Sequence, residues 1–218
     1  MTSPIIVALD LEHDLALDLA KSLDPNNCRL KVGSQLFTSV GPRVIEELSA
    51  LGFEIFLDLK FHDIPNTVAQ SVKAAANLGV WMINVHTSGG STMIKAAKEA
   101  TTGLVDPPLI IGVTMLTSLS EKDVNELGIQ DISNHVLSLA LLAKKNSLDG
   151  IVCSANDVRR IKELLGKDFI TVTPGIRSSD SLKDDQSRVS SAKNAIENGS
   201  DYLVIGRPIT QSVNPMKS

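Results

Sequence analysis

Short runs of apolar, often β-branched residues recur along the whole chain and are typical of β-strands buried on both faces. Between these runs, apolar residues spaced three and four apart indicate helices with one buried face. The clearest helical patterns cover 15–23, 44–51, 68–76 and 136–143, and Gly52 and Gly79 follow two of them as stop signals. The eight predicted strands cover 5–9, 29–32, 53–57, 80–85, 109–114, 150–153, 169–173 and 202–205.

The alternation of strands and helices predicts an α/β fold, a single (β/α)8 TIM barrel with an eight-stranded parallel sheet. We expect one catalytic domain over 1–218, because the length suits a barrel and no linker or change of composition divides the chain. A doubly wound open sheet is the main alternative, but no GxGxxG sequence follows the first predicted strand. In a barrel, functional side chains are expected at the carboxyl ends of the strands.

Composition and charge exclude several classes of protein. The net charge of −4, the absence of a basic run and an aromatic content of 3% argue against nucleic-acid binding. We see neither a membrane-spanning stretch nor a leader sequence, so we expect no membrane association and a cytoplasmic location. Cys28 and Cys153 lie in apolar runs and are expected to be buried, reduced thiols.

The most polar strand end carries two carboxylates and a lysine within six positions. Asp58 and Lys60 are two apart, so they point the same way if the strand continues through them. Lys31 ends the neighbouring strand, and Asp63 follows three residues after Lys60. The alternating signs predict either a charge array that performs chemistry or a structural ion-pair network at the barrel rim. The spacing alone leaves both open.

Other chemistries receive less support from the sequence. A metal site is disfavoured because lysines interrupt the carboxylates. His62 and His86 lack the HxH or HExxH spacing of metal ligands, so each is expected to be a hydrogen-bonded structural histidine. The chain also has no GxSxG nucleophile elbow.

A second polar region follows the last two predicted strands, where barrels often bind phosphate. Gly206 would let backbone N–H groups approach an anion, and Arg207 would supply a bidentate guanidinium. The polar stretch 178–187 is expected to form a loop that closes over a ligand. The alternative is an ordinary surface loop beside a surface arginine.

The sequence Asp58-x-Lys60-x-x-Asp63-Ile-Pro-Asn-Thr67 resembles the signature of the orotidine 5′-phosphate decarboxylase family, in its bacterial branch. The similarity runs from about Ile5 to Thr210. DxKxxD alone is shared with related sugar-phosphate enzymes, whereas DxKxxDIPNT with GRPIT is much more specific. The segments that agree are VALD at 7–10, LKVG at 30–33, NVH at 84–86, TMLTS at 114–118, TPGIR at 173–177, DDQ at 184–186 and VIGRPIT at 204–210.

This resemblance implies decarboxylation of orotidine 5′-monophosphate to UMP and carbon dioxide, the last step of de novo pyrimidine synthesis, with neither metal nor organic cofactor. It implies that Lys60 donates a proton to carbon 6 of the pyrimidine and that Asp58 faces the departing carboxylate. Lys31 and Asp63 would complete the charge array. It also implies a homodimer with shared active sites, in which Asp63 and Thr67 reach into the partner's site.

The resemblance further implies a set of residues that bind the nucleotide monophosphate substrate. Asp10 and Lys31 would contact the ribose, and Thr117, with Ser118 as a possible companion, would lie near the pyrimidine. The phosphate would be held by Arg177, Gly206, Arg207 and Gln186, the last on the closing loop. The whole expected binding set is Asp10, Lys31, Asp58, Lys60, Asp63, Ile64, Thr67, Thr117, Pro174, Arg177, Gln186, Gly206 and Arg207.

Two other functions stay open at this point. One is a Mg²⁺-dependent relative, a hexulose-phosphate synthase or keto-gulonate-phosphate decarboxylase, although such enzymes usually carry an acidic residue where Lys31 stands. The other is a barrel that binds phosphoribosyl ligands without catalysis. The full set of Lys31, Asp58, Lys60 and Asp63 argues against this second reading.

Overall fold

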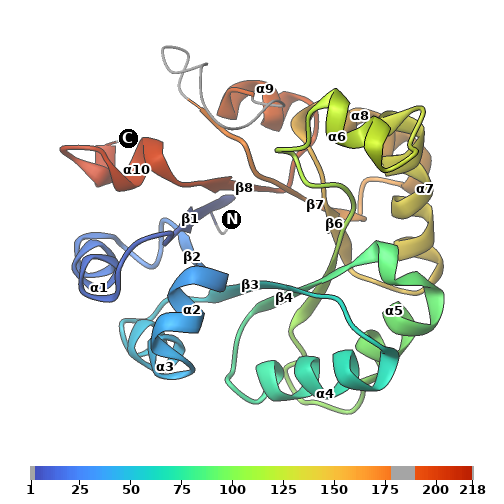
Figure 1. The fold of residues 1–218 in the computed structure, drawn as a ribbon. Coiled ribbons are helices and arrows are strands. Elements are labelled where there is room, and N and C mark those ends of the chain that lie inside the picture. The colour runs from blue at the N-terminus through green and yellow to red at the C-terminus, as the bar shows by residue number, and fades with distance from the viewer. Residues whose placement is uncertain (1–2, 178–189, 218) are drawn as a thin grey trace.

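Eight parallel strands form a closed barrel surrounded by helices in the computed structural model, which describes residues 3–177 and 190–217 (Figure 1). The strands pair in chain order, and β8 pairs with β1 to close the ring. The strands are β1 (Ile5–Ala8), β2 (Arg29–Gly33), β3 (Ile55–Phe61), β4 (Met82–His86), β5 (Leu109–Val113), β6 (Gly150–Val152), β7 (Ile170–Thr173) and β8 (Tyr202–Ile205). The predicted TIM barrel is therefore confirmed; its extent as one domain over 1–218 stays a prediction.

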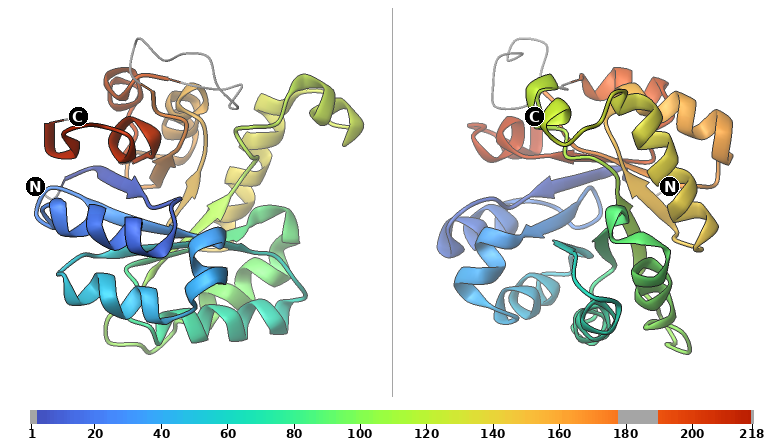
Figure 2. Two further views of the ribbon diagram at one scale, coloured as in Figure 1. Left: turned by 60° about the vertical axis from the view of Figure 1, so that its left-hand side comes forward. Right: turned by 45° about the vertical axis from the view of Figure 1, so that its right-hand side comes forward.

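The helices lie around the outside of the strands (Figure 2). They are α1 (His13–Ser22), α2 (Ser34–Val40), α3 (Arg43–Ala50), α4 (Pro65–Ala76), α5 (Gly90–Glu99), α6 (Glu121–Glu126), α7 (Ile132–Lys145), α8 (Ala155–Leu165), α9 (Ala192–Glu197) and α10 (Arg207–Thr210). Two short 3₁₀ helices are η1 (Thr87–Gly89) and η2 (Pro215–Lys217). Local signals fix several helix starts: Pro65 opens α4, and a Ser120–Asp123 capping box opens α6.

The core has two layers because side chains alternate across each strand. Ile6 and Ala8 of β1 point into the barrel, where they pack with Phe56 and Met82. Val7 and Leu9 point outward into the larger cluster between the sheet and the helices. Both faces of the sheet are thus apolar, which explains the nearly continuous apolar runs in the sequence.

Strand β3 differs from its prediction. We expected 53–57, but the strand is Ile55–Phe61 and includes the charged residues. Leu57 pairs with Ile83, and the next pair is Phe61 with Val85, so β3 carries two extra residues opposite Asn84. Lys60 lies in this bulge with a φ of 52°, a left-handed conformation that is rare for a residue with a side chain. The other strands match their predicted bounds to within two residues.

The amino end of the barrel contains a buried arginine. Arg29 is 6% exposed, and its guanidinium lies 4.2 Å from the ring centre of Trp81. It donates a hydrogen bond to the Ser3 carbonyl at 2.9 Å and forms an ion pair with Glu54 at 2.7 Å. Tyr202 meets Trp81 edge to face and lies within 5.3 Å of the same guanidinium. This stack lies at the amino end of the barrel and joins β2, β8 and the segment leading into β4.

A repeated clamp joins strands at the same end. Asp149, just before β6, accepts hydrogen bonds from the backbone N–H of Ile110 at 2.8 Å and from Lys98 at 2.7 Å. Asp201, just before β8, does the same with the N–H of Thr171 at 2.7 Å and with Lys162 at 2.6 Å. In both cases the lysine comes from the helix on the outer face, so each clamp ties a helix to two adjacent strands.

Both cysteines are buried and free of disulfides, as expected. Burial, with a smaller contribution from nearby Asp24, raises the pKa of Cys28 to about 11, so its thiol stays protonated at neutral pH. None of the helices in the described part of the chain has both the length and the apolar character needed to span a bilayer.

Candidate active site

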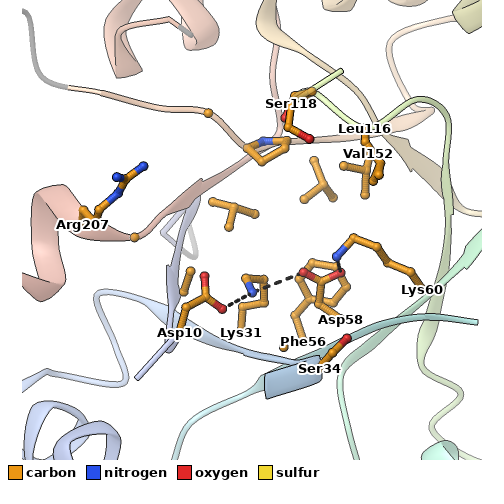
Figure 3. Close-up of a pocket in the computed structure, with 18 of the residues that line it drawn as sticks. Asp10, Lys31, Ser34, Phe56, Asp58, Lys60, Leu116, Ser118, Val152 and Arg207 are labelled. Carbon is orange, nitrogen blue, oxygen red and sulfur yellow. Dashed lines mark hydrogen bonds and ion pairs between the residues drawn. The ribbon is translucent and has the colours of Figure 1, made fainter. Parts of the chain in front are cut away.

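A cavity of about 590 Å³ opens where the strands end, and most of the predicted site residues line it (Figure 3). Phe56, Val113, Val152, Val172 and Val204 form its apolar floor. Polar groups come from the carboxyl ends of β1, β2, β3, β5, β7 and β8 or from the segments that follow them. The predicted residues that line it are Asp10, Lys31, Asp58, Lys60, Thr117, Pro174, Arg177, Gly206 and Arg207, and Ser118 lies beside them.

Four charged side chains of alternating sign form a continuous array along one wall of this cavity. The Nζ of Lys31 lies 3.0 Å from Asp10 Oδ1 and 3.3 Å from Asp58 Oδ2. Asp58 Oδ1 is 2.6 Å from the Nζ of Lys60. Each charge in the array therefore has neighbours of the opposite sign only. The dashed lines in Figure 3 trace these contacts from Asp10 to Lys60.

Burial and charge act against each other at the centre of the array. Lys31 and Asp58 are only 6% and 8% exposed. Burial alone would lower the pKa of Lys31, but the carboxylates of Asp58 and Asp10 outweigh it, so the pKa is raised. Burial would likewise raise the pKa of Asp58, yet Lys31, Lys60 and hydrogen bonds from Lys60 and Asn84 hold it below its usual value. Both groups are therefore charged at neutral pH.

Asn84 connects the array to the bulge in β3. Its side-chain oxygen accepts a hydrogen bond from the backbone N–H of Lys60 at 2.8 Å. Its side-chain nitrogen donates to Asp58 Oδ1 at 2.6 Å. A left-handed residue with a side chain costs about 1–3 kcal/mol and persists only when its surroundings hold it in place. These contacts supply that support.

The two histidines near the array face each other, with ring centres 5.4 Å apart. Burial, together with His62 and Lys60, lowers the pKa of His86 and outweighs the opposite effect of Asp58, so His86 is neutral at pH 7. Within the residues that the structure describes, no group of three or more His, Cys, Asp or Glu side chains could hold a metal ion. The structural role predicted for both histidines stays a prediction.

The two arginines expected to hold phosphate, Arg177 and Arg207, also line the cavity. Figure 3 places Arg207 across the cavity from Lys60, at the start of α10. Arg177 is 7% exposed, and its Nη1 donates to the Ile176 carbonyl at 2.9 Å. The chain returns to this place at Ser190, whose carbonyl accepts from the Arg177 N–H at 3.0 Å. The cavity therefore has an alternating array at one side and an anion-attracting side some distance away.

A family model for the orotidine 5′-phosphate decarboxylase / HUMPS family matches residues 3–218. The chain belongs to this family. An orotidine 5′-phosphate decarboxylase from Chromobacterium violaceum is 56% identical over 99% of the chain and 88% of the relative. One from Legionella pneumophila strain Lens is 55% identical over 99% of the chain and 95% of the relative. The crystal structure of the Lactobacillus acidophilus decarboxylase has a TM-score of 0.85 at 42% identity and covers 99% of the chain and 95% of that protein. The resemblance found in the sequence is confirmed.

Some predicted residues of this family member lie away from the cavity. Asp63, Ile64 and Thr67 are exposed at the end of β3 and the start of α4, and they do not line the cavity. The carboxylate of Asp63 accepts a hydrogen bond from the N–H of Ile64 at 2.6 Å. Within one chain, Lys31 pairs with two carboxylates, those of Asp58 and Asp10, and not with that of Asp63. Gln186 lies outside the described residues, so its predicted role is untested.

Sequence reasoning missed two residues that shape the array. Asn84 stood inside a predicted strand and in the family-like segment NVH, but neither observation indicated a contact with Asp58 or Lys60. Gly33 ends β2, and a Cβ there would lie 3.0 Å from both Asp10 Oδ1 and Lys31 Nζ. The glycine therefore leaves room for the Asp10–Lys31 ion pair. Its presence in LKVG gave no sign of this contact.

Proposed function

We propose that this chain decarboxylates orotidine 5′-monophosphate to UMP and carbon dioxide, the last step of de novo pyrimidine synthesis, without metal or organic cofactor. The observation that carries the proposal is the unbroken array Asp10–Lys31–Asp58–Lys60 in a cavity whose far side presents Arg207. The names of the relatives at 51–56% identity support the same reaction. A cytoplasmic location, expected for such an enzyme, stays a prediction.

The chemical step needs a group that stabilises negative charge on a ring carbon. The bond between carbon 6 and the carboxylate breaks, the electron pair stays on carbon 6, and carbon dioxide leaves. The ammonium of Lys60 stabilises that electron pair and then transfers a proton to carbon 6, which yields UMP. Lys60 then regains a proton from water. Because the array fixes this ammonium before substrate arrives, little reorganisation is needed during the reaction.

Asp58 has two functions in this mechanism. Its Oδ1 lies 2.6 Å from the Nζ of Lys60, so it orients the ammonium and favours the charged form. With Lys60 beside carbon 6, Asp58 faces the substrate carboxylate, and their repulsion is relieved as neutral carbon dioxide departs. Lys31 limits the repulsion that the free enzyme itself would feel, because it lies between Asp58 and Asp10.

Binding energy from the phosphate supports the reaction from a distance. Arg207 and Arg177 attract the phosphate, with the backbone at Gly206 beside it. These contacts do not touch the reacting carbon, so their energy can hold the pyrimidine against Lys60. Thr117 or Ser118, which both line the cavity, would contact the base.

We further propose a homodimer in which Asp63 and Thr67 complete the partner's site. The support is their exposure, next to the end of the strand that carries Lys60, together with Ile64, an apolar side chain that is 66% exposed. Mixing inactive Asp63→Ala and Lys60→Ala proteins should restore part of the activity, because hybrid dimers contain one intact site. If subunit exchange is confirmed and no activity returns, the sites are not shared.

The reaction is tested by the absorbance change of orotidine 5′-monophosphate on adding purified protein, with and without excess chelator. We expect turnover that the chelator leaves unchanged. Turnover that chelation abolishes would favour a metal-dependent relative within the same family. Tight binding of UMP with no turnover would favour a barrel that binds phosphoribosyl ligands only.

A further inference from the structure

Asn84 occupies a place in the barrel where the regular ladder between β3 and β4 is interrupted. Leu57 pairs with Ile83 and Phe61 with Val85, so the two extra residues of β3 lie opposite Asn84. The N–H of Lys60 bonds to the side-chain oxygen of Asn84 at 2.8 Å. A side chain thus takes the part that a backbone carbonyl plays in a regular ladder.

The chemistry of the two partners fixes which way the amide points. The N–H of Lys60 can only donate, so the amide oxygen must face it. The ionised carboxylate of Asp58 can only accept, so the amide nitrogen must face it, at 2.6 Å. One fully buried amide therefore holds the backbone of one array member and the carboxylate of the other.

We propose that Asn84 is a positioning residue for decarboxylation, which sets the Lys60 ammonium and the Asp58 carboxylate in their reactive arrangement. This inference rests on the proposed function for the reaction that it affects. Without the amide, Lys60 loses the contact that supports its left-handed backbone, and Asp58 Oδ1 loses one of its two close donors. Both changes act on the geometry of the reacting groups and leave the phosphate side of the cavity intact.

Two substitutions separate the parts of this role. Asn84→Leu keeps the approximate size of the side chain but removes both hydrogen bonds. Asn84→Asp keeps an acceptor for the Lys60 N–H and replaces the donor to Asp58 with a second carboxyl group. As a matched control, Thr87→Val removes a buried side-chain hydrogen bond from the segment after β4, where Thr87 donates to the Val113 carbonyl at 2.6 Å. The control does not touch the array.

We expect Asn84→Leu to lower kcat about 100-fold, the loss that a displacement of about 1 Å can cause at a reacting group. Its affinity for UMP should match that of Thr87→Val, because the phosphate contacts remain. A residue that only fills the barrel would lower thermal stability and leave kcat of the folded protein unchanged.

The pH profile of Asn84→Asp gives a second readout. A proton shared between the carboxyls at 58 and 84 can replace the amide donor, whereas two ionised carboxylates repel each other. Activity of this variant should therefore fall as pH rises, relative to the wild type, while Asn84→Leu is reduced at every pH. Among the described residues, the other charged or titratable groups that interact with the carboxyl group of Asp58 are Lys31, Lys60 and His86. On the neighbouring strand β5, the residue beside position 84 is the apolar Ile111.

Crystal structures of the variants keep this inference distinct from the proposed function. We expect Asn84→Leu to show Lys60 outside the left-handed region or its Nζ moved away from Asp58. Unchanged Lys60 and Asp58 positions together with near-normal kcat would overturn the positioning role. If the wild type fails to turn over orotidine 5′-monophosphate, the proposed function fails, and the Lys60 geometry in Asn84→Leu still decides whether Asn84 positions it.

Discussion

Replacing Gly33 with alanine should reduce activity while leaving the barrel folded. The new Cβ would lie 3.0 Å from both Asp10 Oδ1 and Lys31 Nζ, whereas ordinary contacts begin at 3.4 Å. The ion pair must therefore shift by at least about 0.4 Å. Because a displacement of about 1 Å can lower the rate about 100-fold, we expect this shift to lower the rate by about five- to tenfold. Lys31 cannot move freely, because it is buried and also bound to Asp58, so the side chain of Asp10, which is 60% exposed, takes up most of the displacement.

The backbone at Gly33 argues against a folding defect. Its φ of −92° and ψ of −179° describe an extended conformation that alanine adopts readily. Such a replacement stabilises a protein by about 0.4–1 kcal/mol through the unfolded chain, which offsets part of the strain at the ion pair. We therefore expect the free energy of unfolding to change by less than about 1 kcal/mol.

The assay is kcat/KM for orotidine 5′-monophosphate, measured beside urea unfolding of the same preparations. Wild-type kcat/KM in Gly33→Ala would refute the reasoning, because the array would then tolerate the displacement. A large fall in the free energy of unfolding would also refute the reasoning, because the lost activity would then come from impaired folding and not from the displaced ion pair.

Three other perturbations test the site. Lys60→Ala should lower decarboxylation by about 10,000-fold or more, because it removes both the proton donor and the cation beside carbon 6, while calorimetry still detects UMP binding; normal turnover would exclude this mechanism. Arg207→Ala should weaken UMP binding by about 10- to 100-fold through lost charge-assisted hydrogen bonds, whereas Arg43→Ala, on the outer helix α3, should leave it unchanged; equal affinities would remove Arg207 from the phosphate site. The lowered pKa of Asp58 stabilises the folded protein at all pH values above the unfolded-state pKa of 3.8, and this contribution is lost as pH falls through the still lower folded-state pKa. The difference in free energy of unfolding between wild type and Asp58→Asn should therefore stay constant from pH 7 to about 5 and shrink only in stronger acid. A decline that begins near neutral pH would contradict the lowered pKa of Asp58.

The barrel was predictable because its strands are buried on both faces and therefore appear as apolar runs. The carboxyl end of β3 was not, because Asp58 and Lys60 interrupt the apolar pattern although the strand continues to Phe61. The resumption of pairing depends on Val85 of β4, a contact that no local pattern contains. The short helix α6 was also missed, since its six residues are too few to display a period.

The candidate site divides in a similar way. Charged residues at strand ends identified Lys31, Asp58 and Lys60, because barrel topology brings those ends together, and the family resemblance added Asp10. The expectation that Asp58 and Lys60 point the same way assumed that a regular strand continues through them, whereas Lys60 has a left-handed backbone within a bulge. Asn84 could not be singled out, because its importance lies in a tertiary contact across two strands. The predicted contribution of Asp63 depends on a second subunit, which the sequence of one chain cannot display.

The clamps at the amino end have a consequence for how this protein could evolve. Asp149 and Asp201 bind neighbouring strands and the helices outside them, at the end of the barrel opposite the cavity. Selection can therefore alter residues at the mouth while the strands remain tied together elsewhere. A duplicated gene for this barrel could exchange its cavity side chains for another substrate and inherit the same closed ring.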